Sequence, residues 1–126
     1  MTDNDNVVLS VPARAEFART VRLAGAELAA RAGMCIDDVD DVRLAVDEAF
    51  LFATERAADS TVTFSFTLSA GSIEMLVGPV PAIHDDSDDG EQGERYARFI
   101  LESICDEYEA VEHEGGTYIR LVKRSA

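Results

Sequence analysis

Two alternating segments near the middle of the chain constrain the fold more than any other feature. Thr61–Ser69 (TVTFSFTLS) alternates polar and apolar residues strictly, which is the pattern of a strand with one buried face. Its apolar face consists of Val62, Phe64, Phe66 and Leu68. Ala70 and Gly71 then turn the chain into Ser72–Gly78 (SIEMLVG), so the two segments predict an antiparallel hairpin. Because an apolar sheet face must be buried, the rest of the chain has to cover it.

Three segments with helical spacing supply this cover. Residues 13–32 repeat apolar side chains every three or four positions and are followed by Gly33, a typical helix C-cap. Residues 40–58 and 94–108 show the same spacing. The chain therefore predicts two helices before the hairpin and one after it.

The predicted order of elements is strand, helix, helix, strand, strand, loop, helix, strand. Residues 7–11 and 117–123 are the first and last strands, and residues 85–94, rich in Asp and Gly, predict a disordered loop. This order indicates an α+β fold, a two-layer sandwich in which three helices cover one face of a small, mostly antiparallel mixed sheet. Because no repeat or long linker divides the chain, residues 1–126 are expected to form a single domain.

Composition narrows the classes of function. The 126 residues include 25 acidic and 11 basic side chains, and the formal net charge of −14 repels nucleic acid and favours a protein partner with basic patches. No stretch approaches the ~18 apolar residues that cross a bilayer, and the polar N-terminus does not resemble a signal peptide. We therefore expect a soluble cytoplasmic protein that binds neither nucleic acid nor membrane, with Cys35 and Cys105 as buried, reduced thiols.

The sequence gives little support for a metal site or a nucleophilic active site. A calcium loop counted from Asp85 would place Tyr96 where a bidentate Glu is required. His84 and His113 lie far apart without a neighbouring ligand set, and neither cysteine has a histidine near it in sequence. The chain also lacks a glycine-rich phosphate loop of the Walker type. No metal site is expected.

The helix at residues 40–58 does not separate cleanly into an apolar and a polar face. At about 100° per residue, five apolar side chains share one face, which we expect to pack on the sheet. These are Val42, Val46, Ala49, Phe50 and Ala53. Leu44 and Leu51 lie on the opposite side, with Glu48 beside them and Phe52 one turn further on. Either the helix is covered and Glu48 reaches solvent, or the helix lines a cleft with an acid in its wall.

Four segments, in order, resemble the anti-sigma regulatory factors, the serine-kinase branch of the GHKL (histidine-kinase-like) ATPase superfamily, and especially its actinobacterial members. They are residues 11–33 (VPARAEFARTVRLAGAELAARAG), 40–57 (DDVRLAVDEAFLFATERA), 99–110 (FILESICDEYEA) and 115–124 (GGTYIRLVKR). The resemblance spans nearly the whole chain and implies the Bergerat ATPase fold. It also implies that active members hold ATP and magnesium between three short boxes, phosphorylate a serine on an anti-anti-sigma protein, and keep an alternative sigma factor from RNA polymerase.

The first two boxes are only partly preserved. In the E-A-x-x-N box, Glu48 matches the general base, but Phe52 replaces the asparagine that coordinates magnesium. In the D-x-G-x-G box, Leu76 stands at the adenine-binding Asp position, Gly78 is retained and Val80 replaces the second glycine. A phenyl ring offers a hard cation no oxygen ligand, and leucine offers adenine no hydrogen bond.

The third box, G-x-G-L, has lost both glycines by the register of the helix that follows. Arg95 and Ala97 take their places, although a shifted alignment would bring Gly90 or Gly93 into this box. Side chains there obstruct the close approach of backbone to phosphate, while Arg95 keeps a positive charge for an anion. We expect no cofactor and a lapsed kinase, with ATP and Mg²⁺ bound only if the pocket still functions.

Partner binding does not require the ATP chemistry. By resemblance, an arginine early in the first helix contacts both the sigma factor and the anti-anti-sigma protein that competes with it. This matches Arg19, with Arg14 and Arg22 as supporting contacts. The leading hypothesis is a degenerate anti-sigma factor that sequesters an alternative sigma factor, and a homodimer is implied by resemblance alone. Two alternatives stay open: an active serine/threonine kinase acting on an anti-anti-sigma protein, and a nucleotide-independent adaptor for another regulator.

Overall fold

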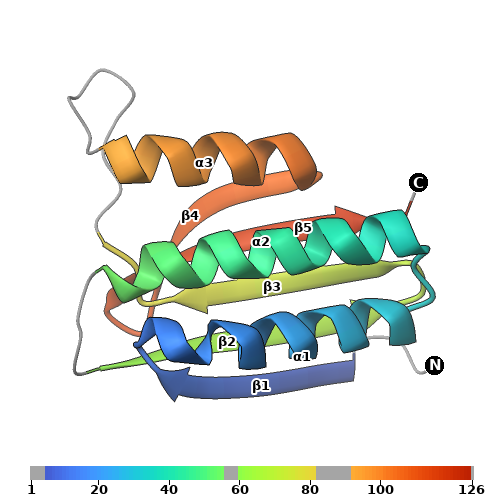
Figure 1. The fold of residues 1–126 in the computed structure, drawn as a ribbon, viewed down its shortest axis with the longest axis horizontal. Coiled ribbons are helices and arrows are strands. Elements are labelled where there is room, and N and C mark those ends of the chain that lie inside the picture. Colours follow the sequence, from blue (N-terminus) through green and yellow to red (C-terminus); the bar gives the residue numbers. More distant parts are fainter. Residues whose placement is uncertain (1–4, 56–59, 82–91, 126) are drawn as a thin grey trace.

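The computed structural model describes residues 5–55, 60–81 and 92–125, which form five strands and three α-helices (Figure 1). In chain order the elements are β1 (Asp5–Pro12), the short 3-10 helix η1 (Ala15–Phe17), α1 (Ala18–Arg31), α2 (Ile36–Thr54), β2 (Thr61–Ser69), β3 (Ser72–Gly78), α3 (Gln92–Ile104), β4 (Glu107–His113) and β5 (Gly116–Arg124). The predicted loop at residues 85–94 lies, up to residue 91, outside the described residues. None of the described helices combines the length and the apolar character that a membrane span needs.

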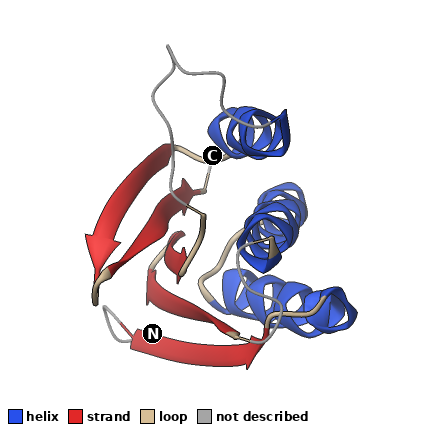
Figure 2. Cartoon of the chain, turned by 90° about the vertical axis from the view of Figure 1, so that its left-hand side faces the viewer, coloured by secondary structure: helices blue, strands red, loops and turns tan. Residues whose placement is uncertain are grey.

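The five strands form one sheet in the order β1-β2-β3-β5-β4. Every neighbouring pair is antiparallel; Phe64 of β2 lies opposite Val77 of β3, and Val77 lies opposite Ile119 of β5. All three helices lie on one face of this sheet, so the predicted α+β sandwich is confirmed (Figure 2). The sheet is not mixed, because the described strands include no parallel pair. β3 and β4, which α3 connects, run in the same direction, but β5 lies between them.

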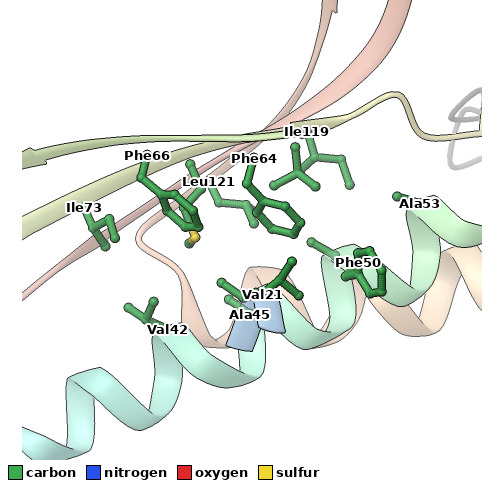
Figure 3. Packing of buried hydrophobic residues seen from close by; sticks show 14 of the residues in the cluster. Val21, Val42, Ala45, Phe50, Ala53, Phe64, Phe66, Ile73, Ile119 and Leu121 are labelled. Atoms are coloured by element: carbon green, nitrogen blue, oxygen red, sulfur yellow. The ribbon is translucent and has the colours of Figure 1, made fainter. Parts of the chain in front are cut away.

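The hydrophobic core lies between the helices and the sheet. From α2, Val42, Val46 and Phe50 are fully buried, as their spacing predicts. Figure 3 shows Val42 and Phe50 of α2 on the side of the helix that packs on the sheet, where the ring of Phe64 stacks on Phe66 with centroids 5.6 Å apart. Full burial of a side chain of this size contributes roughly 1.5–3 kcal/mol, so this layer dominates the stability of the fold.

A glycine sets the distance between α1 and α2. A β-carbon built on Gly25 would lie 2.7 Å from Cγ2 of Val46, which is closer than van der Waals contact allows. Only a residue without a side chain lets the two helices pack at this distance. An ion pair between Arg22 and Asp47, with nitrogen and oxygen 3.7 Å apart, crosses the same interface.

The region after α3 differs from the prediction. The helix expected to continue to Tyr108 ends at Ile104, and Glu107–His113 forms the edge strand β4 instead. The segment EYEAVEH alternates charged and less polar residues only over its first four positions, so its strand signal is weak beside the helical spacing that precedes it. Asp106 holds the junction, because its carboxylate accepts a hydrogen bond from the backbone N–H of Arg124 at 2.6 Å.

The two thiols lie in different surroundings. Cys105 is half-buried, and burial raises the pKa of its thiol to about 12. Cys35 is exposed, so the prediction of a buried thiol is wrong for this residue. It precedes α2, where its thiol donates a hydrogen bond to the carboxylate of Asp38 at 3.3 Å.

Candidate functional site

The three predicted boxes meet at one end of the sandwich. The C-terminal half of α2, the end of β3 and the beginning of α3 lie together there (Figure 1). Phe52 of α2, Val80 just beyond β3 and Ala97 of α3 belong to one contiguous cluster of buried apolar residues. One residue of each box is therefore buried in the same hydrophobic core.

Glu48 is the one acid at this end of α2 that matches a catalytic position, and it is half-buried. No residue in the described ranges donates a hydrogen bond to its carboxylate or forms an ion pair with it. Burial, followed by the charge of neighbouring Asp47, raises the pKa of the Glu48 carboxyl above its usual value. Such a carboxylate binds a proton more readily than a free glutamate does. Within residues 5–55, 60–81 and 92–125, no three His, Cys, Asp or Glu side chains gather closely enough to hold a metal ion.

Three of the other box positions are packed rather than open. The side chains of Phe52 and Ala97 are each 5% exposed, and Val80 is fully buried. The backbone N–H of Val80 donates a hydrogen bond to the carbonyl of Thr117 at 2.8 Å, so this amide already has a partner within the protein. Arg95, at the start of α3, is exposed. Of these positions, Arg95 alone presents a charged group to solvent.

Two residues of the second box, Leu76 and Gly78, lie at the end of β3 in different surroundings. Leu76 is half-buried and pairs in register with Arg120, on the sheet face turned away from the helices. The helix-facing residue next to it is Val77, which is fully buried. Gly78 has a packing role, because a β-carbon there would lie 2.6 Å from the ring of Tyr118. The structure therefore does not bring Leu76 to the other box positions.

The predicted partner-binding arginines lie on and beside α1. Arg19 and Arg22 line a groove of ≈570 Å³ between α1 and α2, here called the arginine groove. Its lining residues are Arg19, Arg22, Leu23, Asp40, Arg43, Leu44 and Asp47. Arg19 is exposed and has no ion-pair partner among the described residues, whereas Arg22 pairs with Asp47. Arg14 does not line the groove; its guanidinium lies 5.2 Å from the ring centroid of Phe17 and 3.4 Å from Glu16.

Comparison with known families places this geometry in context. The sequence profile of the histidine kinase-like ATPase domain matches residues 11–123, which is nearly the whole chain. The chain belongs to this family. The domain is thus a histidine kinase-like ATPase domain by descent, and its α+β sandwich is the family's fold.

Relatives of this histidine kinase-like domain include serine-protein kinases named RsbW. That of Bacillus subtilis is 24% identical over 131 aligned residues, covering 90% of this chain and 82% of the relative. That of Halalkalibacterium halodurans is 35% identical over 75 residues, which cover 58% of this chain and 46% of the relative. Among solved structures, the RsbU and RsbW domains of a Mycobacterium tuberculosis protein superpose with a TM-score of 0.68 at 25% identity, covering 95% of this chain and 32% of that one.

The domain has a second groove that the sequence did not predict. It has a volume of ≈360 Å³, lies between α2 and α3, and is here called the apolar groove. Its lining residues are Leu44, Tyr96, Phe99, Ile100, Ser103 and Ile104. The helical spacing of α3 runs through Tyr96 and Phe99, which are 61% and 64% exposed, whereas Ala97 and Leu101 of the same helix are buried. The sequence does contain a sign of this groove, because α3 carries a second apolar stripe, rotated about the helix axis from the stripe that packs in the core.

Proposed function

We propose that this domain regulates transcription by contact, binding an alternative sigma factor while nucleotide binding and phosphoryl transfer have been lost. The observation that carries the proposal is Phe52. By resemblance, this position holds the asparagine that coordinates magnesium, and here it holds a phenyl ring that is 5% exposed within the core. Similarity to the RsbW proteins supports the broader role of a partner-switching regulator.

The residues around Phe52 do not fit a magnesium–nucleotide complex. Magnesium requires a near-octahedral set of oxygen ligands, which the side chains of Phe52 and Val80 do not offer. On the helix-facing side of β3 stands Val77, which has no polar group for the amino group of adenine. Ala97 fills its position with a buried methyl group where a glycine would leave room. No phosphoryl-transfer step is therefore assigned to Glu48.

Arg19 is the residue we assign to partner contact. It is an exposed cation without an ion-pair partner among the described residues, in a chain of net charge −14. An arginine in this setting makes bidentate hydrogen bonds to a carboxylate and is a frequent hot spot of interfaces. The partner is an alternative sigma factor, for which an anti-anti-sigma protein competes, and the domain works as a homodimer as the resemblance implies.

Charge reversal at Arg19 tests the assignment. Each alternative sigma factor of the host is titrated against wild type, Arg19→Glu and the matched control Arg31→Glu, which lies on the same helix and pairs with Glu27. We expect Arg19→Glu to weaken the bound sigma factor at least ~30-fold, the loss typical of a hot spot, and Arg31→Glu to change the affinity little. Circular dichroism verifies that both variants fold. Unchanged affinity in Arg19→Glu would refute the contact.

Thermal unfolding with and without millimolar ATP and magnesium tests the loss of nucleotide binding. A ligand at ~100 times its Kd stabilises a one-site protein by about 2.7 kcal/mol, which raises Tm by several degrees. We expect no rise for this domain and a clear rise for the B. subtilis RsbW kinase in the same buffer. A rise for this domain would mean that Phe52 does not close the pocket.

One observation favours a second candidate, an active serine kinase. Glu48 is half-buried with a raised pKa, as a general base requires. Incubation with labelled ATP and a candidate anti-anti-sigma protein decides between the two. Phosphate transfer that disappears in Glu48→Ala would establish the kinase.

A further inference from the structure

The arginine groove and the apolar groove form one continuous surface. Leu44 lines both of them, at the middle of α2. On one side of Leu44 lie the guanidinium groups of Arg19, Arg22 and Arg43, and on the other lie the exposed apolar side chains of α3. A ligand that crosses α2 at Leu44 would therefore meet a basic region and then an apolar one.

The apolar groove is suited to hydrocarbon rather than to a polar ligand. Leu44, Tyr96 and Phe99 are 41%, 61% and 64% exposed, which leaves an apolar patch in contact with water. The hydroxyl of Ser103, which also lines the groove, already donates a hydrogen bond to the carbonyl of Phe99 at 2.6 Å. The groove offers a ligand little beyond carbon surface and the Tyr96 hydroxyl.

The arginine groove favours a ligand that carries a carboxylate next to the apolar part bound in the apolar groove. Of its three arginines, Arg22 and Arg43 pair with Asp47 and Asp40, which also line the groove. Arg19 remains without an ion-pair partner among the described residues. Three cations and two anions leave one positive charge, on a chain whose formal net charge is −14. An acidic group on the ligand would complete the charge balance.

The shape of the surface favours a helical ligand. The helical layer presents no strand edge, so an extended peptide would leave its backbone N–H and C=O groups without partners, whereas a helix satisfies its own. Packed helices lie about 8–10 Å apart, so the path from α1 over α2 to α3 measures roughly 16–20 Å. At about 1.5 Å per residue, a helix of ~11–13 residues spans it.

We infer that this surface binds an acidic amphipathic helix of the sigma factor, with apolar side chains in the apolar groove and a carboxylate at Arg19. The inference rests on the proposed function and extends it from one arginine to a surface that includes Leu44 and Phe99. A second copy of the chain is a poorer occupant, because its matching surface offers Arg19 no unpaired carboxylate: the two acids of the arginine groove already pair with Arg22 and Arg43.

The test uses the sigma factor that wild type binds most tightly among those of the host. Its affinity is measured for Leu44→Ser and Phe99→Ser, and for two controls that exchange an exposed apolar residue elsewhere. Ile36→Ser removes a side chain that is 78% exposed on α2 outside both grooves, and Val8→Ser removes one that is 61% exposed on the open sheet face. We expect at least tenfold weaker binding for the two groove variants and less than twofold change for the controls.

The outcomes separate the inference from the proposed function. If wild type and Ile36→Ser bind while the two groove variants do not, the inference stands. If Arg19→Glu loses binding but Leu44→Ser and Phe99→Ser keep it, the proposed function survives and the apolar groove is overturned as a docking surface. If Val8→Ser weakens binding and the groove variants do not, the partner covers the sheet face and the inference fails. If wild type binds no sigma factor, the proposed function and the inference fall together.

Discussion

Replacing Phe52 with alanine should destabilise the domain strongly, because its ring is part of the core rather than the wall of an open pocket. The side chain is 5% exposed and shares a buried cluster with Val80 and Ala97. Burial of a phenylalanine contributes roughly 1.5–3 kcal/mol, and the cavity left by truncation adds to the loss. Phe→Ala substitutions in cores cost about 3–5 kcal/mol in total. We expect Phe52→Ala to fall within this range.

Phe99→Ala is the matched control, since it removes the same atoms from a position that is 64% exposed. Surface substitutions of this kind change stability by less than about 0.5 kcal/mol. Urea unfolding of both variants and of wild type gives the two free-energy changes from the midpoints and slopes. If Phe52→Ala costs no more than Phe99→Ala, the ring does not pack in the core. The argument that a core residue has replaced a magnesium ligand would then fail.

Three further predictions address the acid, the helix contact and the buried charge. Glu48→Gln should stabilise the domain at neutral pH, because burial raises the pKa of Glu48 and so makes its ionised form unfavourable in the folded state. This loss of stability is absent below the pKa of the unfolded chain, about 4.3, and grows as pH rises through the higher pKa of the folded state. Urea unfolding of variant and wild type across pH checks this, and a difference that does not shrink on acidification would contradict it. Gly25→Ala should cost roughly 1 kcal/mol despite the higher helix propensity of alanine, since its methyl group would lie 2.7 Å from Val46. In a double-mutant cycle, adding Val46→Ala should recover much of that loss, and simple additivity would rule out the clash. Lys123→Met should lower the free energy of unfolding by about 1–3 kcal/mol, because Asp41 loses an ion pair at 3.0 Å and Asp38, 5% exposed, loses the same cation 3.9 Å away. An unchanged Tm would show that these ion pairs contribute nothing to stability.

The sheet hairpin and the central helix could be predicted from the sequence because each has a single period. The alternation of Thr61–Ser69 places Phe64 and Phe66 on the buried face, as observed. The three- and four-residue spacing of α2 likewise places Val42, Val46 and Phe50 in the core. Where one face is buried, the pattern of apolar residues specifies both the element and its orientation.

The sequence does not predict side-chain orientation where two apolar stripes overlap on one helix, or where the orientation depends on the exact register of a strand. α3 carries two apolar stripes, and no local rule says that Leu101 packs inward while Phe99 faces the groove. The following strand β4 is half-exposed, so its alternation is weak. At the end of β3, a shift of one residue moves a side chain to the other face of the sheet, which is why Val77 rather than Leu76 faces the helices. The roles of Glu48 and Phe52 remain predictions that the fold permits.

One ridge of α2 runs from the proposed docking surface to Phe52, the position that by resemblance would hold a magnesium ligand. Leu44, Glu48 and Phe52 follow one another at intervals of four residues, each turned by about 40° from the one before. Along this ridge the side chains pass from 41% exposed at Leu44, through half-buried Glu48, to 5% exposed at Phe52. Phe52 and Ala97 of α3 both belong to the hydrophobic core that lies beneath the two helices of the apolar groove. Phe52, which by resemblance stands at the position of a magnesium ligand, therefore belongs to the core beneath the surface through which we propose the domain acts.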